Sequence, residues 1–471
     1  MLNLLRRHRR FFLGTALAGI ALRLFFVVYF PAVTDDSRVY ADFATNWMEH
    51  GIYALTQSGE IVPSDTRLPG YPGFLAAIFA LFGAGNFRAV MLTQILVDLA
   101  TCFIIADLAR RTVSDQAARI AFVLAVLCPF LANYAAAVLT ETLEVFFTVM
   151  ALDCAVAGLN RLNQGLFSWI AWAGSGLSIA ACILLRPDGG IVLVAVCLYL
   201  AFLGWKRWRE HSTLAPLMKA AVLSGLLALA PLAPWTMRNF RTLHHFQPLA
   251  PRYATEPDET APRGFNRWAA TWIVDYVSVE EIYWNVPGDK IDPDKLPSRA
   301  IDSAAQGDAT LALIADYNES HDLTPELDAR FGELGAQRIR ERPLRYYVVL
   351  PALRIADMWL RPRTELLPSD PRWWEFNDEP RGSIMAVALG LLNIVYVGAA
   401  LLVILWRFSS VRYAGLLVAF VVLRSAFLGT IENPEPRYTL ECYPIVILFA
   451  ATLASDWRSG SAQAAEQGAH R

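Results

Sequence analysis

The residues in this sequence that could do chemistry are charged side chains at the ends of long apolar runs. Asp35 and Asp36 directly follow the first such run, and Glu141 opens another. Burying a charge at membrane depth is costly, so a carboxylate at such a position indicates a function. A carboxylate within hydrogen-bond reach of a hydroxyl can accept its proton as that hydroxyl attacks. The two aspartates could instead be solvated or cap a helix, an interpretation that fits Glu141 less well.

Arginines stand at the ends of other apolar runs. They are Arg67, Arg186, Arg238 and Arg437. A guanidinium group is planar and always charged, and it can stabilise the oxyanion that forms as a phosphate leaves a sugar. Each arginine alone could equally be an interfacial anchor, but together with the acids they favour a site for an anionic lipid headgroup. His and Cys show no ligand spacing on this side, so the sequence predicts neither a metal nor a cofactor.

These residues must be positioned by helices that cross a membrane. The chain has 471 residues, of which 55% are hydrophobic and only 18% charged, and this composition argues against a soluble enzyme. A bilayer core about 30 Å thick needs roughly 20 apolar residues in a helix, and about ten runs meet that test. They lie near residues 11–31, 88–109, 117–136, 137–157, 167–185, 188–205, 215–235, 383–405, 412–430 and 437–455.

Every other connection between these runs is basic, as expected of cytoplasmic loops. This alternation places both termini in the cytoplasm, and the loop 32–70 and the insert 240–382 on the outer side. The first apolar run has no clear cleavage site after Phe30, so we expect it to remain as a helix. The net charge of −2 argues against nucleic acid as a partner.

The chain is therefore expected to be an all-α, multi-pass membrane protein. Its expected parts are an N-terminal transmembrane module (1–239) with its first outer loop (32–70), a cap (240–382), C-terminal transmembrane helices (383–456) and a cytoplasmic tail (457–471). The cap shows helix-like runs around 298–318 and 324–341 and an amphipathic helix near 344–360.

Several motifs in this order resemble those of GT-C glycosyltransferases that use polyprenyl-phosphate sugars. The run Asp36-Ser37-Arg38-Val39-Tyr40-Ala41, followed by Arg67-Leu68-Pro69-Gly70-Tyr71-Pro72-Gly73, is similar to the first outer loop of that superfamily. Thr140-Glu141, Leu185-Arg186-Pro187, Pro234-Trp235-Thr236-Met237-Arg238-Asn239 and Pro436-Arg437-Tyr438 also resemble motifs of bacterial members. The superfamily includes protein mannosyltransferases (glycosyltransferase family 39) and lipid A aminoarabinose transferases.

The resemblance implies a bundle of about ten transmembrane helices with interfacial helices on the outer face and a small, mostly helical periplasmic insert. It implies an enzyme that moves a hexosyl or pentosyl group from a polyprenyl-phosphate carrier to a lipid, glycan or protein acceptor, with inversion. The setting would be a bacterial inner membrane in the cell envelope, with the active site facing the periplasm.

The resemblance also assigns roles to residues. Asp36 would be the general base, with Asp35 as the fallback, and Glu141 a second acid near the reaction. Donor binding would fall to Arg67, Tyr71, Arg186, Arg238 and Arg437.

The insert 240–382 departs from this pattern, because it matches no known domain of the superfamily. A polytopic transporter or lipid flippase is the alternative, and a non-catalytic scaffold for envelope assembly is a third possibility. The charges gather at one membrane face and no repeat relates the halves, which disfavours a transporter. The sugar, the carrier lipid, the acceptor and the oligomeric state stay open.

Overall fold

The computed structural model describes residues 1–207, 209, 211–253, 260–376 and 380–455, and the chain divides into two compact units. Unit 1 contains Met1–Ala250, Val395–Leu423 and the chain from Leu440 onward. Unit 2 contains Pro251–Ile394 and Arg424–Thr439. Helices dominate both units, and the sheet of the described residues is a single two-stranded hairpin.

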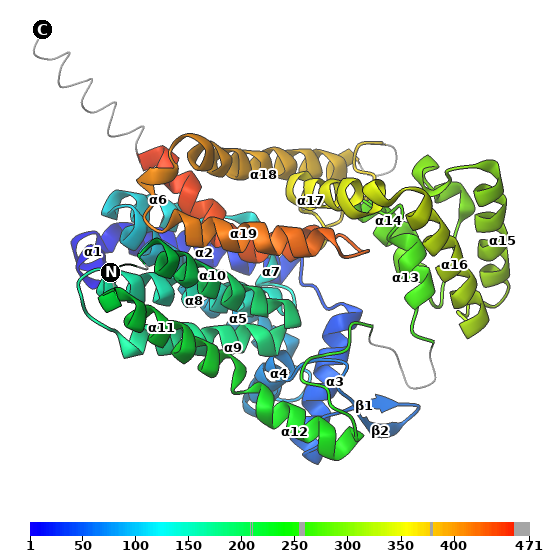
Figure 1. Ribbon diagram of the computed structural model, residues 1–471, viewed down its shortest axis with the longest axis horizontal. Coiled ribbons are helices and arrows are strands. Elements are labelled where there is room, and N and C mark those ends of the chain that lie inside the picture. The colour runs from blue at the N-terminus through cyan, green and yellow to red at the C-terminus, as the bar shows by residue number, and fades with distance from the viewer. Residues whose placement is uncertain (208, 210, 254–259, 377–379, 456–471) are drawn as a thin grey trace, which may run out of the picture. The chain divides into compact units, whose positions relative to one another are not determined.

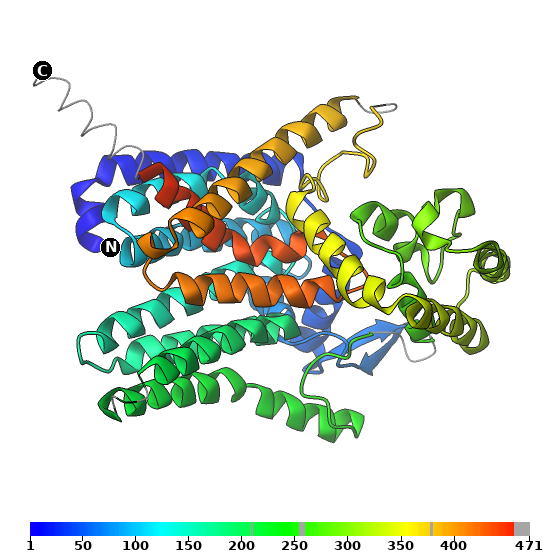
Figure 2. The same cartoon turned by 45° about the horizontal axis from the view of Figure 1, so that its top comes forward.

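The long helices of unit 1 pack side by side (Figure 1 and Figure 2). Up to residue 250 its elements are α1 (Leu2–Arg7), α2 (Arg9–Tyr29), α3 (Asp35–His50), β1 (Ala54–Gln57), β2 (Glu60–Pro63), α4 (Gly70–Phe82), α5 (Phe87–Thr112), α6 (Asp115–Val126), α7 (Pro129–Tyr134), α8 (Glu141–Leu162), α9 (Trp169–Leu185), η1 (Pro187–Gly190), α10 (Ile191–Lys206), α11 (His211–Leu229) and α12 (Leu232–Leu243). Helix α8 packs between α5 and α9, and α11 packs against α9 and α10. Of the later elements, η6 (Phe408–Ser410) lies in unit 1, whereas α18 (Pro380–Trp406), α19 (Ala414–Gly429) and η7 (Pro436–Cys442) each contribute residues to both units.

Seven helices of the described chain are long and apolar enough to cross a membrane. They are Arg9–Tyr29, Phe87–Thr112, Glu141–Leu162, Pro187–Lys206, Leu214–Leu243, Pro380–Trp406 and Pro436–Ser455. Shorter apolar helices cover Gly70–Phe82, Trp169–Leu185 and Ala414–Gly429. The expectation of an all-α, multi-pass membrane protein is thereby confirmed, while the count of ten spans stays a prediction.

One expected span, 117–136, is not a continuous helix. It consists of α6 and α7, which are separated at Cys128. Cys128 is extended, with φ −69° and ψ 111°, and Pro129 opens α7. A residue before proline is disfavoured in the helical conformation, so this dipeptide ends one helix and starts the next. Hydropathy averages over such a break, which is why the sequence pattern did not reveal it.

The first outer loop is held together by local hydrogen bonds. A capping box between Thr34 and Ser37 starts α3, and Gly51 ends it in the left-handed conformation at φ +69°. The β1–β2 hairpin then returns the chain, and Asp42 of α3 accepts hydrogen bonds from the Thr56 backbone N–H at 2.6 Å and its hydroxyl at 2.8 Å. These contacts fix the hairpin on the helix that carries Asp36.

A main-chain pairing joins the start of this loop to the segment before α8. The Ala32 N–H donates to the Ala136 carbonyl at 3.0 Å, and the Val138 N–H donates to the Ala32 carbonyl at 3.0 Å. The buried Gln94 of α5 also donates to the carbonyl of Ala137 at 2.6 Å. Asp36 and Glu141 thus lie only a few residues from this main-chain pairing of Ala32 with residues 136–138, which is called the joint below.

Unit 2 is a small helical assembly around a buried aromatic core. Besides its shares of α18, α19 and η7, its elements are α13 (Arg263–Ala269), α14 (Tyr276–Glu281), η2 (Tyr283–Asn285), η3 (Pro293–Lys295), η4 (Ser298–Ala300), α15 (Ala304–Ser320), α16 (Pro325–Glu341), the π-helical turn η5 (Arg345–Val349) and α17 (Leu350–Leu360). Trp268, Trp272 and Phe331 are fully buried where α13 packs against α16. The mostly helical insert expected from the sequence is present, with α15 and α16 close to the predicted runs.

Where the sequence predicts an amphipathic helix, η5 and α17 form one. One face of α17 packs against the end of α19. Arg354 donates to the Gly429 carbonyl at 3.2 Å, and Trp359 donates to the Ser425 hydroxyl at 3.0 Å. The other face carries exposed apolar side chains, such as Leu353 and Leu360.

Candidate active site

The two aspartates that open α3 have different surroundings. Asp35 forms an ion pair with Arg38 at 2.7 Å, and its side chain is 95% exposed. Asp36 Oδ1 lies 3.0 Å from Arg67 Nη2, and its side chain is 36% exposed. Only Asp36 is therefore held against another functional candidate, and this geometry favours Asp36 over Asp35 as the reacting carboxylate.

Tyr40 lies one helical turn after Asp36 and forms the centre of the cluster. The Arg67 guanidinium carbon is 5.7 Å from the centre of the Tyr40 ring, and the Tyr71 ring meets it edge-on at 5.1 Å. Burial, together with Asp36 and Glu141, raises the pKa of Tyr40 to about 12, although Arg67 and Arg186 act to lower it. The phenol therefore stays protonated at neutral pH and can act as a hydrogen-bond donor.

Arg67 stays charged in this setting. Burial by itself lowers the pKa of Arg67, but Tyr40 and Asp36 together raise it above its ordinary value. The Tyr53 hydroxyl donates to the Arg67 and Leu68 carbonyls at 3.0 and 3.1 Å, which fixes the backbone that carries the guanidinium group. Arg67 is thus a positioned cation, still 28% exposed.

Tyr71 is fully buried, and its position follows from the start of α4. Its hydroxyl donates to Gln94 Oε1 at 2.8 Å. One residue earlier, a Cβ on Gly70 would lie 2.5 Å from the Leu184 carbonyl oxygen, so only glycine permits this close approach of α4 to α9. The Tyr71 ring therefore packs against the Tyr40 ring and supports it. The expected contact of Tyr71 with the donor stays a prediction.

Glu141 and Arg186 meet beside this cluster. Glu141 is buried at the first residue of α8, and its Oε1 lies 3.5 Å from Arg186 Nη1. Arg186 ends α9, and its Nε lies 3.2 Å from Asp188 Oδ1. Asp36, Arg67, Glu141 and Arg186 all act electrostatically on Tyr40, so the fold brings four of the predicted residues to one place.

Arg238 has a different set of contacts. Its guanidinium group donates to the backbone carbonyls of Tyr53 and Ser64, the latter at 2.9 Å. The same group lies over the rings of Tyr53 and Trp235, at 5.4 and 5.3 Å. These contacts bind the end of α12 to the first outer loop. They give Arg238 a structural role, and its predicted contact with a donor phosphate stays untested.

Arg437 belongs to unit 2. Its Nε lies 2.6 Å from Glu435 Oε2, and its guanidinium carbon lies 5.3 Å from the centre of the Tyr438 ring. The Tyr438 hydroxyl donates to Glu435 Oε1 at 2.5 Å. The expected share of Arg437 in the same site as Asp36 stays a prediction.

Two residues of the cluster were not singled out as site residues from the sequence. Tyr40 is four residues after Asp36, a spacing that places both on one helix face, and this spacing was the available signal. Asp188 stands two residues after Arg186, where Pro187 turns the chain back toward it. Among the residues that the structure describes, no three His, Cys, Asp or Glu side chains gather as in a metal site.

Comparison with known proteins adds a family pattern. Residues 66–237 match the family described as dolichyl-phosphate-mannose-protein mannosyltransferase. The matched segment includes Arg67, Tyr71, Glu141 and Arg186. No curated protein sequence matches the chain.

Two solved structures of the oligosaccharyltransferase AglB from Archaeoglobus fulgidus share the fold. One, in complex with an inhibitory peptide and a dolichol-phosphate, aligns over 98% of this chain and 52% of its own, with a TM-score of 0.52 and 13% identity. The apo form aligns over the same shares with a TM-score of 0.51 and 13% identity. This chain thus spans about half the length of the archaeal enzyme.

The transferase ArnT from Cupriavidus metallidurans, in its apo state, aligns over 94% of this chain and 76% of its own at 15% identity. Its TM-score of 0.35 is too low to support an inference. The resemblance expected from the motifs is confirmed by the family match and by the AglB structures. Over residues 66–237 the chain carries the sequence pattern of the dolichyl-phosphate-mannose-protein mannosyltransferase family, and it shares the fold of the Archaeoglobus fulgidus oligosaccharyltransferase.

Proposed function

We propose that this protein is a membrane glycosyltransferase that moves a sugar from a polyprenyl-phosphate carrier to an extracytoplasmic acceptor, with inversion. The observation that carries the proposal is the Asp36–Arg67 pair, 3.0 Å apart, which Tyr40 joins to the Glu141–Arg186 pair. A carboxylate can accept the proton of the acceptor, and guanidinium groups can stabilise the charge that develops on the leaving phosphate. The family pattern over residues 66–237 supports the same reaction class.

In the proposed reaction, the Asp36 carboxylate accepts the proton of an acceptor hydroxyl as its oxygen attacks the anomeric carbon of the donor sugar. The new carbon–oxygen bond forms as the bond from that carbon to the phosphate oxygen breaks. Both electrons of the broken bond go to the polyprenyl phosphate, which leaves with one more negative charge. Attack from the face opposite the leaving group inverts the anomeric centre.

The arginines would act on that leaving phosphate. Arg67 is charged, held by its backbone and partly exposed, so it can donate to a phosphate oxygen when a donor is bound. Arg186 is oriented by Glu141 and Asp188 and would stabilise the same developing charge. Tyr40, held protonated, would donate a hydrogen bond to the bound sugar or phosphate.

We place the protein in a bacterial inner membrane with this site facing the periplasm. The support is the alternation of basic connections along the sequence, which assigns the loop 32–70 to the outer side. The carrier would be a polyprenyl phosphate, and the acceptor a lipid, a glycan or a protein.

The test compares Asp36→Asn with Asp35→Asn, two neighbouring and isosteric changes. Membranes with equal amounts of each variant receive radiolabelled polyprenyl-phosphate sugars, and labelled product is counted. We expect Asp36→Asn to lose about 10²- to 10⁴-fold in rate, the usual contribution of a general base. Asp35→Asn should keep the wild-type rate, because that side chain is 95% exposed and paired only with Arg38. Equal rates for Asp36→Asn and the wild type would remove Asp36 from the mechanism.

A further inference from the structure

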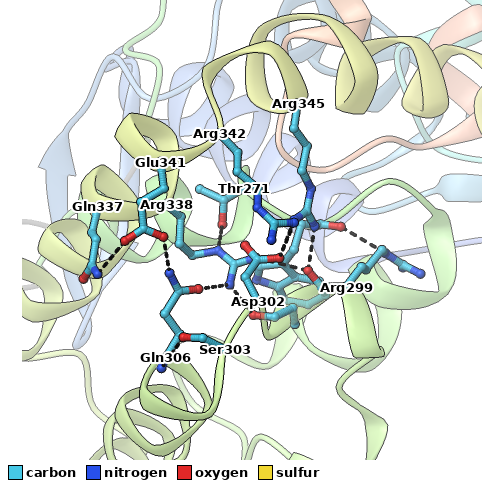
Figure 3. Close-up of polar contacts among 12 residues, drawn as sticks. Thr271, Arg299, Asp302, Ser303, Gln306, Gln337, Arg338, Glu341, Arg342 and Arg345 are labelled. Atoms are coloured by element: carbon cyan, nitrogen blue, oxygen red, sulfur yellow. Dashed lines mark hydrogen bonds and ion pairs between the residues drawn. The ribbon is translucent and has the colours of Figure 1, made fainter.

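Unit 2 contains a carboxylate that is shared by three arginines. Asp302 precedes Ser303, the residue that caps the N-terminus of α15. Its oxygens lie 2.5 Å from Arg345 Nη1, 3.2 Å from Arg338 Nη2 and 3.4 Å from Arg342 Nη1 (Figure 3). One negative charge therefore faces three positive charges at this point of unit 2.

The three arginines are not equivalent. Arg338 is buried, and it donates to Thr271 Oγ1 at 2.9 Å and to Gln306 Oε1 at 3.0 Å, besides two backbone carbonyls. Arg342 is 54% exposed, and its guanidinium group has the longest of the three contacts with Asp302. Burial lowers the pKa of Arg338, and Arg345 and Arg342 lower it further, whereas Asp302 and Glu341 raise it. Arg342 thus carries the exposed positive charge of this cluster, and Arg340, near the same end of α16, is exposed as well.

An exposed apolar surface continues directly from these arginines. It is formed by Leu344, Tyr347, Val348 and Leu353, which expose 76%, 67%, 58% and 47%. These residues recur at helical spacing along η5 and α17, and the opposite face of α17 packs against α19. A basic end followed by an apolar face is the composition of a helix that lies in the headgroup and acyl region of a bilayer.

The neighbouring residues of α19 show in which direction this surface runs. Helices α17 and α19 run side by side in opposite directions. Trp359 contacts Ser425, and Arg354 contacts Gly429, the last residue of α19. The arginines at the other end of this segment therefore lie past the end of α19, an apolar helix. The exposed apolar residues before Arg354 therefore also continue past the end of α19, next to the arginines.

We propose that residues 340–353 form a binding site for an anionic phospholipid of the bilayer, separate from the proposed donor site. Arg340 and Arg342 would bind the phosphate diester, whose charge offsets the surplus around Asp302. The acyl chains would lie along Tyr347, Val348 and Leu353. Charge complementarity selects an anionic lipid over a neutral one, and the continuous apolar face selects a bilayer lipid over a water-soluble phosphate.

The experiment measures lipid preference with the full-length chain, independently of any activity. Delipidated protein is mixed with equal amounts of phosphatidylglycerol and phosphatidylcholine, and bound lipids are counted by native mass spectrometry. We expect the wild type to prefer phosphatidylglycerol, and the double variant Arg340→Gln/Arg342→Gln to lose about fivefold of that preference per arginine. Added salt should weaken the wild-type preference in the same direction.

Two controls separate charge from packing. Arg330→Gln removes another arginine of α16, 51% exposed and paired with Asp316, and should leave the preference unchanged. Tyr347→Ser/Leu353→Ser should lower the occupancy of both lipids without changing their ratio. An unchanged preference in the double arginine variant, or one insensitive to salt in the wild type, would overturn the proposal. Displacement of phosphatidylglycerol by an equal amount of polyprenyl phosphate would also overturn it, in favour of a second carrier site.

Discussion

Two arginine–aspartate pairs in unit 1 have the same chemistry and opposite settings. Arg23 and Asp98 lie 2.5 Å apart between α2 and α5, with side chains 0% and 4% exposed. Arg23 Nη1 also donates to the carbonyls of Gly19 and Val126, at 3.0 and 2.6 Å. Arg67 and Asp36 are 3.0 Å apart and remain partly exposed.

The two pairs differ in how far solvent and ligands can reach their side chains, and not in residue type. This difference separates a structural pair from one that can react. In the first pair the N–H groups of Arg23 donate to Asp98 and to two backbone carbonyls, so the pair holds α2 against α5. In the second pair solvent and ligands can still reach both side chains. The same two residue types can thus stabilise the bundle at one place and serve the proposed chemistry at another.

The largest effect is expected from breaking the closed pair. Asp98→Asn leaves the Arg23 charge buried with its anion removed, which should destabilise the protein by about 3–5 kcal/mol. Thermal unfolding of the purified protein in detergent measures this. The double variant Arg23→Met/Asp98→Leu should recover most of the loss, because no uncompensated charge remains. A double variant as unstable as Asp98→Asn would show that packing, rather than charge, holds α2 to α5.

Breaking the open pair should instead affect activity. Arg67→Gln removes a cation from Asp36 and from the proposed phosphate position, so we expect sugar transfer to fall about 100-fold. Arg67→Lys keeps the charge but loses the planar fork and should fall about tenfold. Both variants should unfold within about 1 kcal/mol of the wild type, since a partly exposed pair contributes little to stability. A loss of stability as large as that of Asp98→Asn would erase the distinction between the two pairs.

The next test uses the pH dependence of the unfolding temperature to probe Tyr40, which packs beside the Asp36–Arg67 pair. The pKa of Tyr40 is raised from its ordinary value of 10.0 to about 12, so the folded protein holds this proton more tightly than the unfolded chain. That contribution to stability is complete below pH 10 and is lost as the pH rises from about 10 to 12; its size is on the order of 2 kcal/mol. The unfolding temperature of the wild type should therefore fall more steeply over this window than that of Tyr40→Phe. Parallel curves for the two proteins would contradict the burial of Tyr40.

The smallest of these effects is expected at Arg238. Unlike Arg23 and Arg67, this arginine donates mainly to backbone carbonyls. Arg238→Gln removes donors to the Tyr53 and Ser64 carbonyls and should cost about 1–2 kcal/mol of stability. Limited proteolysis between residues 51 and 66 should become faster, because the first outer loop loses its link to α12. If the variant loses activity without any change in proteolysis, Arg238 acts on the substrate, as the sequence resemblance implies.

Sequence patterns predicted the membrane helices, the helical insert and the residue types of the site. Hydropathy and the ends of apolar runs were sufficient for this, because both depend on residue type alone. Asp36, Arg67, Glu141 and Arg186 were found in this way, and the structure brings them together around Tyr40.

Contacts to the backbone could not be predicted. Arg238 donates to carbonyl groups, which every residue carries, so no sequence pattern marks its partners. The break between α6 and α7 was hidden by the hydropathy of its flanks. The sharing of Asp302 by three arginines depends on the packing of η4, α16 and η5, elements that the sequence does not place together.

The pairing of Ala32 with the segment before α8 has a consequence for mutagenesis. It is made entirely by main-chain groups of Ala32, Ala136 and Val138, and residues 135–137 are alanines already. An alanine scan would therefore leave these two main-chain hydrogen bonds in place, and it would reach the joint only through Gln94, which donates to the Ala137 carbonyl. Proline at position 32 or 138, which removes a donating N–H, is the substitution that reaches it.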